Sequence, residues 1–245
     1  SEAIHDNERL EGLYYILGLD EKKTYDFTPE GDKDYANLNY GAVILATDQD
    51  HDGKGNITSL IINYFMVFWP CLVKRGYLRR LNTPIIRAIH KKSDTVKSFN
   101  SISGFEAWKL TLNLREDLYN KTYETKYYKG LALHGEDDIK DIFMNFDRNL
   151  HIYTMDPQSE QLFEEYFGRS SAHRKTHLRT PVSIDFPETA RIISVSDHLS
   201  IDTKAYKRYK ITCMLPHVND GFLITRRKIF ATARMVMNEL ATMNV

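Results

Sequence analysis

The feature that most limits the fold of this sequence is an apolar run that ends against closely spaced carboxylates. In "GAVILATDQDHDG", residues 41–53, the run "VILA" is followed by Asp48, Asp50 and Asp52. A nearly continuous apolar run predicts a strand buried on both faces of a sheet. Carboxylates at this spacing repel one another unless a cation or several hydrogen-bond donors lie among them. The sequence therefore predicts a binding site at the carboxyl end of this strand.

The segment after Gly53 has the periodicity of an amphipathic helix, with Pro70 expected to kink it and Gly76 to end it. Open α/β sheets bind ligands at the carboxyl ends of their strands, so the order strand, acidic loop, helix suits a binding site. The apolar positions expected on the buried face are Ile57, Leu60, Ile61, Tyr64, Phe65 and Phe68.

Strand and helix patterns alternate further along the chain. "GYLRRL" and "TPIIRAI" predict strands, "SGFEAWKL" predicts a helix, and "KYYKGL" predicts a strand that runs into a glycine loop. A further helix is expected in "GEDDIKDIFMNF", whose acidic first turn suits the positive end of the helix dipole. This alternation is typical of an α/β domain. In the last helix the apolar face is expected to consist of Ile139, Ile142, Phe143 and Phe146.

The composition changes after this domain, which we expect to span residues 1–155. Polar and basic residues become more frequent up to Thr180, and we expect a helical connector over residues 156–186. A second unit, residues 187–245, contains the turn-rich "LPHVNDG" and then "RRKIFATARMVMNEL", which predicts an amphipathic helix with a basic start.

Composition also narrows the class of protein. The longest apolar run, "IINYFMVFWPCLV", is too short to span a membrane and includes Asn63 and Pro70. Cys71 and Cys213 lie far apart, which indicates no zinc motif or disulfide framework and fits a reducing compartment. Lys and Arg together number 33, as do Asp and Glu, so any contact with nucleic acid must come from local basic patches.

Three interpretations compete for the acidic motif. An EF-hand calcium loop shares the opening D-x-D-x-D-G, but it needs a preceding helix and a Glu at its twelfth position, where this chain has Ser59. A solvated turn that caps the next helix would explain a single Asp. A magnesium site for phosphate chemistry explains all three, since hard oxygen ligands at a strand end leave coordination positions for water and phosphate. We favour the magnesium site.

The motifs resemble those of one family in both sequence and order. "ILATDQDHDGKGNITSLIINYF" resembles the second acidic motif of the TOPRIM domain in type IIA DNA topoisomerases, "TPIIRA" its T-P-I-I strand, and "YYKGL" its Y-Y-K-G-L loop. "LPHVNDGFLITRRKIF" resembles the start of the family's winged-helix DNA gate, and its place in the same polypeptide resembles the eukaryotic single-chain enzyme. The implied fold is a Rossmann-like TOPRIM domain with a mainly parallel central sheet flanked by helices, then a helical connector and the start of a winged helix.

The chain also departs from the family's pattern. Ala132, Leu133 and His134 follow the K-G-L motif where the family usually has Gly-Thr or Gly-Ser, and Cys213 stands where it has an Arg. The segment 223–226 replaces the family's K-P-x-Q. These departures indicate a divergent member, and a virus is among the sources that would fit.

The resemblance implies an ATP-dependent enzyme that cleaves and rejoins both strands of duplex DNA and passes another duplex through the break. By the same resemblance, Asp48 and Asp50 would bind Mg²⁺ directly, and Asp52 directly or through water. The enzyme would be an intracellular homodimer, nuclear or cytoplasmic, or in the host cell if viral. Its ATP would bind upstream of this chain.

The resemblance further implies that two catalytic groups lie outside this chain, which begins without Met and ends in a helical pattern, as a piece of a longer protein would. The family's catalytic Glu lies on an E-G-x-S turn well upstream of the aspartates. Glu30 in "PEGDKDY" lies too close to Asp48 for that role, and Glu11 is rejected as well. The nucleophilic tyrosine belongs far downstream. We therefore expect no catalytic residue here beyond the metal ligands, and no DNA cleavage by this chain alone.

Candidate DNA contacts come from the K-G-L motif, the start of the gate helix and the acidic loop. The Arg of the family's Q-R-K corresponds to Arg227, whose guanidinium would grip a phosphate, although a solvated basic helix end is the alternative. His173 and His177 have helical zinc spacing but no third ligand nearby, so we expect surface residues. The expected DNA contacts are Lys129, Gly130, Arg226, Arg227, Lys228 and His51, the last of which could equally be placed by its turn.

The sequence is also compatible with two other functions. A magnesium-dependent TOPRIM nuclease or primase-like enzyme would pack residues 187–245 on the sheet. A DNA-binding module would use the acidic site only as structure. A type II topoisomerase would instead continue the second unit into a tyrosine-bearing wing.

Overall fold

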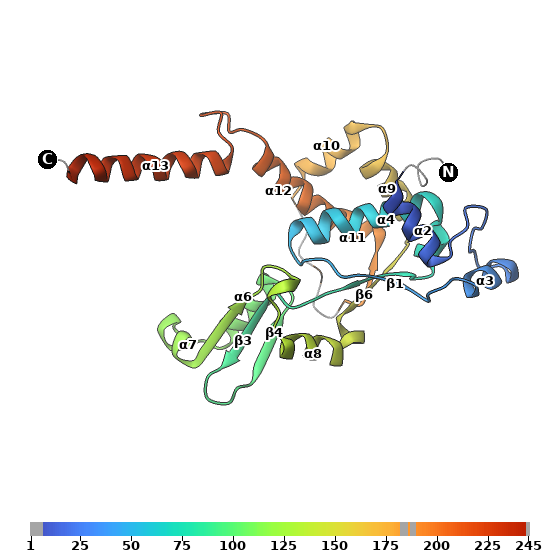
Figure 1. Ribbon diagram of the computed structural model, residues 1–245, viewed down its shortest axis with the longest axis horizontal. Coiled ribbons are helices and arrows are strands. Elements are labelled where there is room, and N and C mark those ends of the chain that lie inside the picture. Colours follow the sequence, from blue (N-terminus) through green and yellow to red (C-terminus); the bar gives the residue numbers. More distant parts are fainter. Residues whose placement is uncertain (1–6, 182–185, 187–189, 244–245) are drawn as a thin grey trace.

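The computed structural model describes residues 7–181, 186 and 190–243, and it confirms an α/β fold (Figure 1). The strands are β1 (Val43–Leu45), β2 (Leu78–Leu81), β3 (Ile86–His90), β4 (Val96–Phe99), β5 (Tyr123–Tyr127), β6 (Leu150–Thr154) and β7 (Ile192–Ser194). The α-helices are α2 (Glu8–Leu17), α3 (Pro29–Ala36), α4 (Thr58–Phe68), α5 (Pro70–Lys74), α6 (Ile102–Thr111), α7 (Glu116–Thr122), α8 (Glu136–Met144), α9 (Ser159–Phe167), α10 (Ser171–Arg179), α11 (Val195–His198), α12 (Lys204–Met214) and α13 (Ile224–Met243). Shorter turns are the π-helical η1 (Gly53–Ile57) and η4 (Leu199–Thr203) and the 3₁₀-helical η2 (Leu131–Leu133) and η3 (Phe146–Asn149).

The larger sheet has the strand order β1-β2-β6-β7. Its outer pairs, β1 with β2 and β6 with β7, are parallel, and the central pair is antiparallel. The strand predicted from the apolar run is therefore present, but the predicted burial on both faces is wrong, because Ile44 is 38% exposed. Only the face with Val43 packs against the main core, and an apolar run does not reveal which face of an edge strand is covered.

The smaller sheet is antiparallel, with the order β4-β3-β5, and α6 and α7 cover it (Figure 1). The helix predicted in "SGFEAWKL" is confirmed as α6, and the Ser101 hydroxyl caps it by accepting a hydrogen bond from the Gly104 amide. This sheet has a core of its own, made of Ile86, Ala88, Phe99, Phe105 and Tyr119.

The helix after the acidic motif forms as predicted, but its buried face differs from the prediction. α4 ends at Phe68, α5 begins at Pro70, and Gly76 adopts a positive φ of 69° that closes the segment. Tyr64 and Phe65 are buried as expected, whereas Leu60 is 53% exposed. The face at the start of α4 is occupied by buried hydroxyl side chains, Thr58 and Ser59, and hydrophobic periodicity cannot detect these.

α8 also forms as predicted, and again only part of its expected face is buried. Ile142 is buried, but Ile139 is exposed and Phe143 is 62% exposed. α8 is attached to the smaller sheet by charged contacts to Arg87, described below, which explains why it needs little apolar surface.

The connector is helical, as predicted, and forms α9 and α10. The boundary predicted at 186–187 falls beside residues 182–185 and 187–189, which lie outside the described residues, so it remains a prediction. α13 extends away from both sheets with most of its apolar side chains exposed (Figure 1). Of the helices in the described part of the chain, none has both the length and the apolar character to cross a membrane.

Candidate metal and nucleic-acid site

The acidic turn begins where β1 ends, and its side chains alternate between solvent and sheet. Asp48 and Asp50 are exposed. Gln49, between them, turns inward, and its Nε2 donates to the Leu81 carbonyl oxygen at 3.1 Å. The Arg80 Nη1 in turn donates to the Gln49 Oε1 at 3.3 Å. The inward Gln49 therefore anchors the turn to β2 and leaves the two carboxylates facing outward.

Arg80 is itself fixed inside the sheet. It is 1% exposed, and its Nη2 lies 3.2 Å from the Nδ1 of His151, its directly paired neighbour on β6. Burial, followed by the positive charge of Arg80, lowers the pKa of His151 to about 4. The imidazole is therefore neutral near pH 7 and can accept the hydrogen bond from Arg80, so a rigid layer supports Gln49.

The turn closes over its own backbone after the aspartates. The Gly53 amide donates to Asp50 Oδ1 at 2.8 Å, and a Cβ at Gly53 would lie 2.1 Å from the Asp48 carbonyl oxygen, so no other residue fits there. Asp52 Oδ1 accepts from Asn56 Nδ2 at 3.1 Å and lies 3.9 Å from the Nζ of Lys210 on α12. Asp48 and Asp50 are thus exposed, whereas Asp52 is half-buried beside Asn56 and Lys210.

These donors suit a magnesium ion held by few protein ligands. Among the residues that the structure describes, no three acidic, His or Cys side chains are grouped so that they could hold a metal ion. Mg²⁺ is commonly bound through one or two carboxylates and takes its other ligands from water and substrate phosphates. The exposed Asp48 and Asp50 fit such a site, whereas a cage of three carboxylates does not form. Asp52 as a metal ligand remains a prediction.

The structure brings the K-G-L loop to this acidic turn, although the two come from different sheets. A Cβ at Gly130 would lie 2.9 Å from Asp48 Oδ1 and 3.0 Å from Oδ2, so a larger residue here would displace the Asp48 carboxylate. Lys129, next to it, is exposed. The predicted DNA contacts Lys129 and Gly130 therefore lie beside the predicted metal ligand Asp48.

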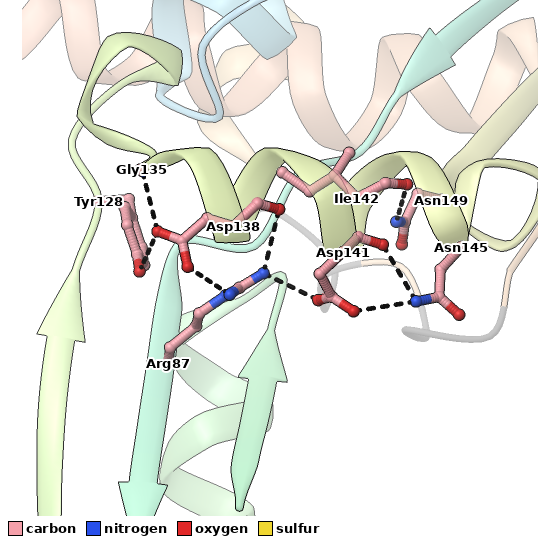
Figure 2. A network of polar contacts seen from close by, with 8 residues as sticks. All are labelled: Arg87, Tyr128, Gly135, Asp138, Asp141, Ile142, Asn145 and Asn149. Atoms are coloured by element: carbon pink, nitrogen blue, oxygen red, sulfur yellow. Dashed lines mark hydrogen bonds and ion pairs between the residues drawn. The ribbon is translucent and has the colours of Figure 1, made fainter. Parts of the chain in front are cut away.

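Tyr128 and α8 hold this loop in place (Figure 2). The Tyr128 hydroxyl donates to Asp138 Oδ2 at 2.9 Å, and the Gly135 amide donates to the same oxygen at 3.1 Å. The His134 ring stacks on Tyr128 with centroids 4.2 Å apart. His134, a departure from the family's pattern, thus contributes to the packing of the loop.

Arg87 on β3 links the same helix to the smaller sheet (Figure 2). Its guanidinium pairs with Asp138 and, at 2.9 Å, with Asp141 Oδ2. Burial opposes the charge of Asp138, but hydrogen bonds from Tyr128 and Gly135 and the charge of Arg87 outweigh it and lower the pKa of this carboxyl. Asp138 therefore stays ionised and connects the loop, helix and sheet.

α12 forms the other side of the acidic turn, and sequence reasoning missed it. The Tyr209 ring lies 5.0 Å from the His51 ring, and Lys210 faces Asp52 as described. The basic and aromatic letters of "KAYKRYK" are visible in the sequence. Their position beside residues 51–52 depends on packing between distant segments, which the sequence alone did not reveal.

The remaining predicted DNA contacts lie elsewhere. Arg226 and Lys228 are exposed in the first turn of α13, which extends away from both sheets (Figure 1). Arg227 donates to both oxygens of Asp220, from Nε at 2.7 Å and from Nη2 at 2.9 Å. The "LPHVNDG" loop turns at Gly221, with φ of 66°, and this ion pair fixes it to α13. The structure does not bring these cations to the acidic turn.

The histidines with zinc spacing form no metal site in the described residues. His177 Nε2 lies 2.5 Å from Glu165 Oε2, and its ring stacks on Tyr166 at 5.0 Å. These contacts join α10 to α9. His173 is exposed, as predicted for a surface residue, whereas His177 is half-buried between the two helices.

Comparison with known proteins places this arrangement in a family. The family described as "C-terminal associated domain of TOPRIM" matches residues 81–209. The chain is 38% identical over 238 residues to "DNA topoisomerase 2" of African swine fever virus (isolate Pig/Kenya/KEN-50/1950), covering 94% of this chain and 19% of that protein. It is 32% identical over 244 residues to "DNA topoisomerase 2, mitochondrial" of Dictyostelium discoideum, covering 98% and 18%. The chain thus spans about a fifth of the length of these relatives.

A solved structure agrees with these sequence relatives. The crystal structure of the "Plasmodium falciparum topoisomerase II DNA-binding, cleavage and re-ligation domain" matches with a TM-score of 0.78 and 25% sequence identity. The match covers 94% of this chain and 30% of that one. The fold and the homology to type II DNA topoisomerases predicted from the motifs are therefore confirmed.

Proposed function

Because this chain belongs to the family of the C-terminal associated domain of TOPRIM and is homologous to a segment of type II DNA topoisomerases, we propose that it forms the magnesium-binding part of such an enzyme. The enzyme would cleave and rejoin both strands of duplex DNA and pass another duplex through the break. The observation that carries this proposal is the position of Gly130 and Lys129, which places a cation-bearing loop against the carboxylate of Asp48.

In this proposal Asp48 and Asp50 hold Mg²⁺, which supplies stabilisation of charge on the phosphate of the cleaved bond. Lys129, exposed and next to Gly130, would bind a neighbouring phosphate of the DNA backbone. Gly130 has no side chain between the loop and Asp48. The DNA backbone could therefore come close to both. His51, exposed between the aspartates, would contact the same backbone.

The finer organisation is also proposed. Residues 1–155 would be the TOPRIM domain, 156–186 the connector and 187–245 the beginning of the winged-helix gate, with Arg226, Arg227 and Lys228 contacting DNA. The whole enzyme would be a homodimer that binds ATP outside this chain. The catalytic Glu and Tyr would also lie outside it, so this chain would bind metal without cleaving DNA.

Metal binding by this chain gives the first test. Mn²⁺, which also prefers oxygen ligands, can be titrated and followed by electron paramagnetic resonance. We expect Asp48→Asn and Asp50→Asn each to weaken Mn²⁺ binding at least about tenfold, since each removes a direct ligand. Asp117→Asn on α7, an exposed carboxylate of the smaller-sheet unit, is the matched control and should bind Mn²⁺ like the original chain. Unchanged binding in Asp48→Asn would refute the site.

DNA chemistry gives the second test, in the longer enzyme that contains this segment. Asp48→Ala should abolish Mg²⁺-dependent formation of the covalent protein–DNA adduct, while Asp117→Ala should leave it intact. Cleavage that persists in Asp48→Ala would exclude a catalytic metal at this carboxylate.

A further inference from the structure

Two π-helical turns meet behind the acidic turn. η1 directly follows Asp52, and η4 directly precedes α12. A π-helical turn has one more residue per hydrogen-bonded ring than an α-helix and frequently marks a functional position. At their contact, a Cβ on Gly55 would lie 2.3 Å from the Asp202 carbonyl oxygen and 2.5 Å from the Tyr206 Cβ. The two backbones therefore approach as closely as glycine allows.

A buried hydroxyl joins these turns. Ser59 Oγ lies 2.6 Å from the Gly55 carbonyl oxygen, 3.0 Å from His198 Nε2 and 2.7 Å from Thr203 Oγ1. The carbonyl oxygen can only accept, so the single hydroxyl hydrogen of Ser59 is donated to it. His198 Nε2 must then carry a hydrogen and donate to Ser59. This assignment fixes the direction of hydrogen bonding across the interface.

Asp202 completes the cluster from the second turn. Its Oδ2 lies 3.4 Å from His198 Nδ1, and both side chains are buried, with His198 fully so. Burial opposes the charge of Asp202, but its contact with His198 and the positive charges of Arg80 and Lys54 outweigh it and lower the pKa of Asp202 to about 2. Asp202 is therefore a buried carboxylate whose charge also acts on Arg80, the residue that holds Gln49.

Ser, His and Asp in this order match the composition of a hydrolytic triad, but their location argues against catalysis. Ser59 is 2% exposed and His198 has no exposed surface, so no substrate can reach the hydroxyl. A nucleophile must contact its substrate. The cluster is better explained by what it connects: the turn that carries the aspartates and the helix that carries Tyr209 and Lys210.

We propose that Ser59, His198 and Asp202 are positioning residues for the acidic turn. They lock η1 against η4 and so hold α12 where Lys210 meets Asp52 and Tyr209 meets His51. The expected effect on metal binding rests on the proposed function of Asp48 and Asp50. The expected effect on the packing of η1 against η4 does not. Groups that orient metal ligands from behind typically change metal affinity by about 10- to 100-fold when removed.

Mn²⁺ titration of the 245-residue chain tests the metal-binding consequence. Asp202→Asn should weaken Mn²⁺ binding about tenfold or more. Asp197→Asn, an exposed carboxylate on the adjacent α11, should leave binding unchanged. Phe105→Leu, which disturbs only the core of the smaller sheet, controls for lost stability. Unchanged binding in Asp202→Asn, or equal weakening in Phe105→Leu, would overturn the positioning role.

A readout without metal separates this proposal from the proposed function. In amide hydrogen exchange by NMR, Asp202→Asn and the milder Ser59→Ala should speed exchange at Gly53, whose amide is bonded to Asp50, and should reduce the ring-current shift that Tyr209 imposes on His51. Gly41→Ala, where a Cβ meets nothing within 4 Å, should change neither, whereas Gly55→Ala should change both. If exchange and shift stay unchanged in Asp202→Asn and Ser59→Ala, the positioning role fails. If Mn²⁺ binding is unaffected by Asp48→Asn, the proposed function fails instead.

Discussion

Two polar networks hold the neighbours of the acidic turn, and they differ in their exposure to water. The Ser59–His198–Asp202 cluster fixes α12 from inside the protein, and Asp202 is only 9% exposed. The Arg87–Asp138–Asp141 cluster fixes α8 and the K-G-L loop near the surface, where the Asp141 side chain is 51% exposed (Figure 2). Removing one partner from a buried charged cluster strands the others away from water, whereas exposed partners can be rehydrated. The two sides of the same site should therefore respond differently to mutation.

The largest effect is expected from His198→Ala in the buried cluster. This change leaves a cavity, removes the donor to Ser59 and leaves the buried Asp202 carboxylate without the imidazole 3.4 Å from it. We expect the free energy of unfolding to fall by about 3–5 kcal/mol. Urea denaturation followed by circular dichroism measures it. A loss below about 1 kcal/mol, the size of an ordinary hydrogen bond, would show that the cluster contributes no more than a surface contact.

The pH dependence of stability should distinguish the buried His151 and Arg80, which support the acidic turn, from the Arg87 network near the surface. The folded-state pKa of His151 is about 4, below its ordinary value of 6.5, because burial and Arg80 disfavour the charged ring. A histidine shifted in this direction stabilises the fold fully above pH 6.5, and this contribution is lost as the pH falls from 6.5 towards 4. At about 1.4 kcal/mol per pKa unit, the loss amounts to about 3 kcal/mol.

His151→Gln, which cannot titrate, should flatten this part of the stability curve. The measurement is urea denaturation at a series of pH values between 7 and 4. His90→Gln, on the half-buried end of β3 in the smaller sheet, is the control and should keep the slope of the original chain. An equal slope in the original chain and in His151→Gln would contradict the assignment.

Arg87→Ala tests the exposed side of the comparison and should cost less. The change removes charged hydrogen bonds to Asp138 and Asp141, but both carboxylates can reach water. We expect a loss of about 1–3 kcal/mol, as for hydrogen bonds to charged groups. Arg115→Ala, whose ion pair with Asp117 is fully at the surface, should cost less than about 0.5 kcal/mol.

The salt dependence of stability should also differ between the two networks. Raising the salt concentration should shrink the difference between Arg87→Ala and the original chain, because the exposed Asp141 end of the network is screened even though Arg87 itself is buried. The difference for His198→Ala should change little. Equal salt sensitivity in both variants would remove the distinction between the two networks.

The sequence revealed the parts of the site that use local patterns. The strand end, the acidic turn with Gly53 and the glycine loop at Gly130 each left a motif in consecutive residues, and the structure places Gly130 beside Asp48. The buried polar residues left no such signal. Ser59, Arg80 and Asp202 read as ordinary surface residues by hydropathy, and only packing between distant segments buries them. For the same reason Leu60 and Phe143, assigned to buried faces by periodicity, are exposed.

The smallest effect is expected from Tyr128→Phe, which removes only one hydrogen bond of the exposed network. The hydroxyl donates to Asp138, and burial together with this bond raises the pKa of Tyr128 to about 12, so the phenol is neutral and remains a donor at ordinary pH. Its loss should cost about 0.5–1.5 kcal/mol. Tyr127→Phe, at the adjacent exposed position, should cost almost nothing. Because the loop carries Gly130, the decisive measurement is amide exchange at Gly130 in the two variants. Faster exchange in Tyr128→Phe alone would show that the network at the surface positions the loop, whereas identical exchange would leave His134 stacking as the contact that holds it.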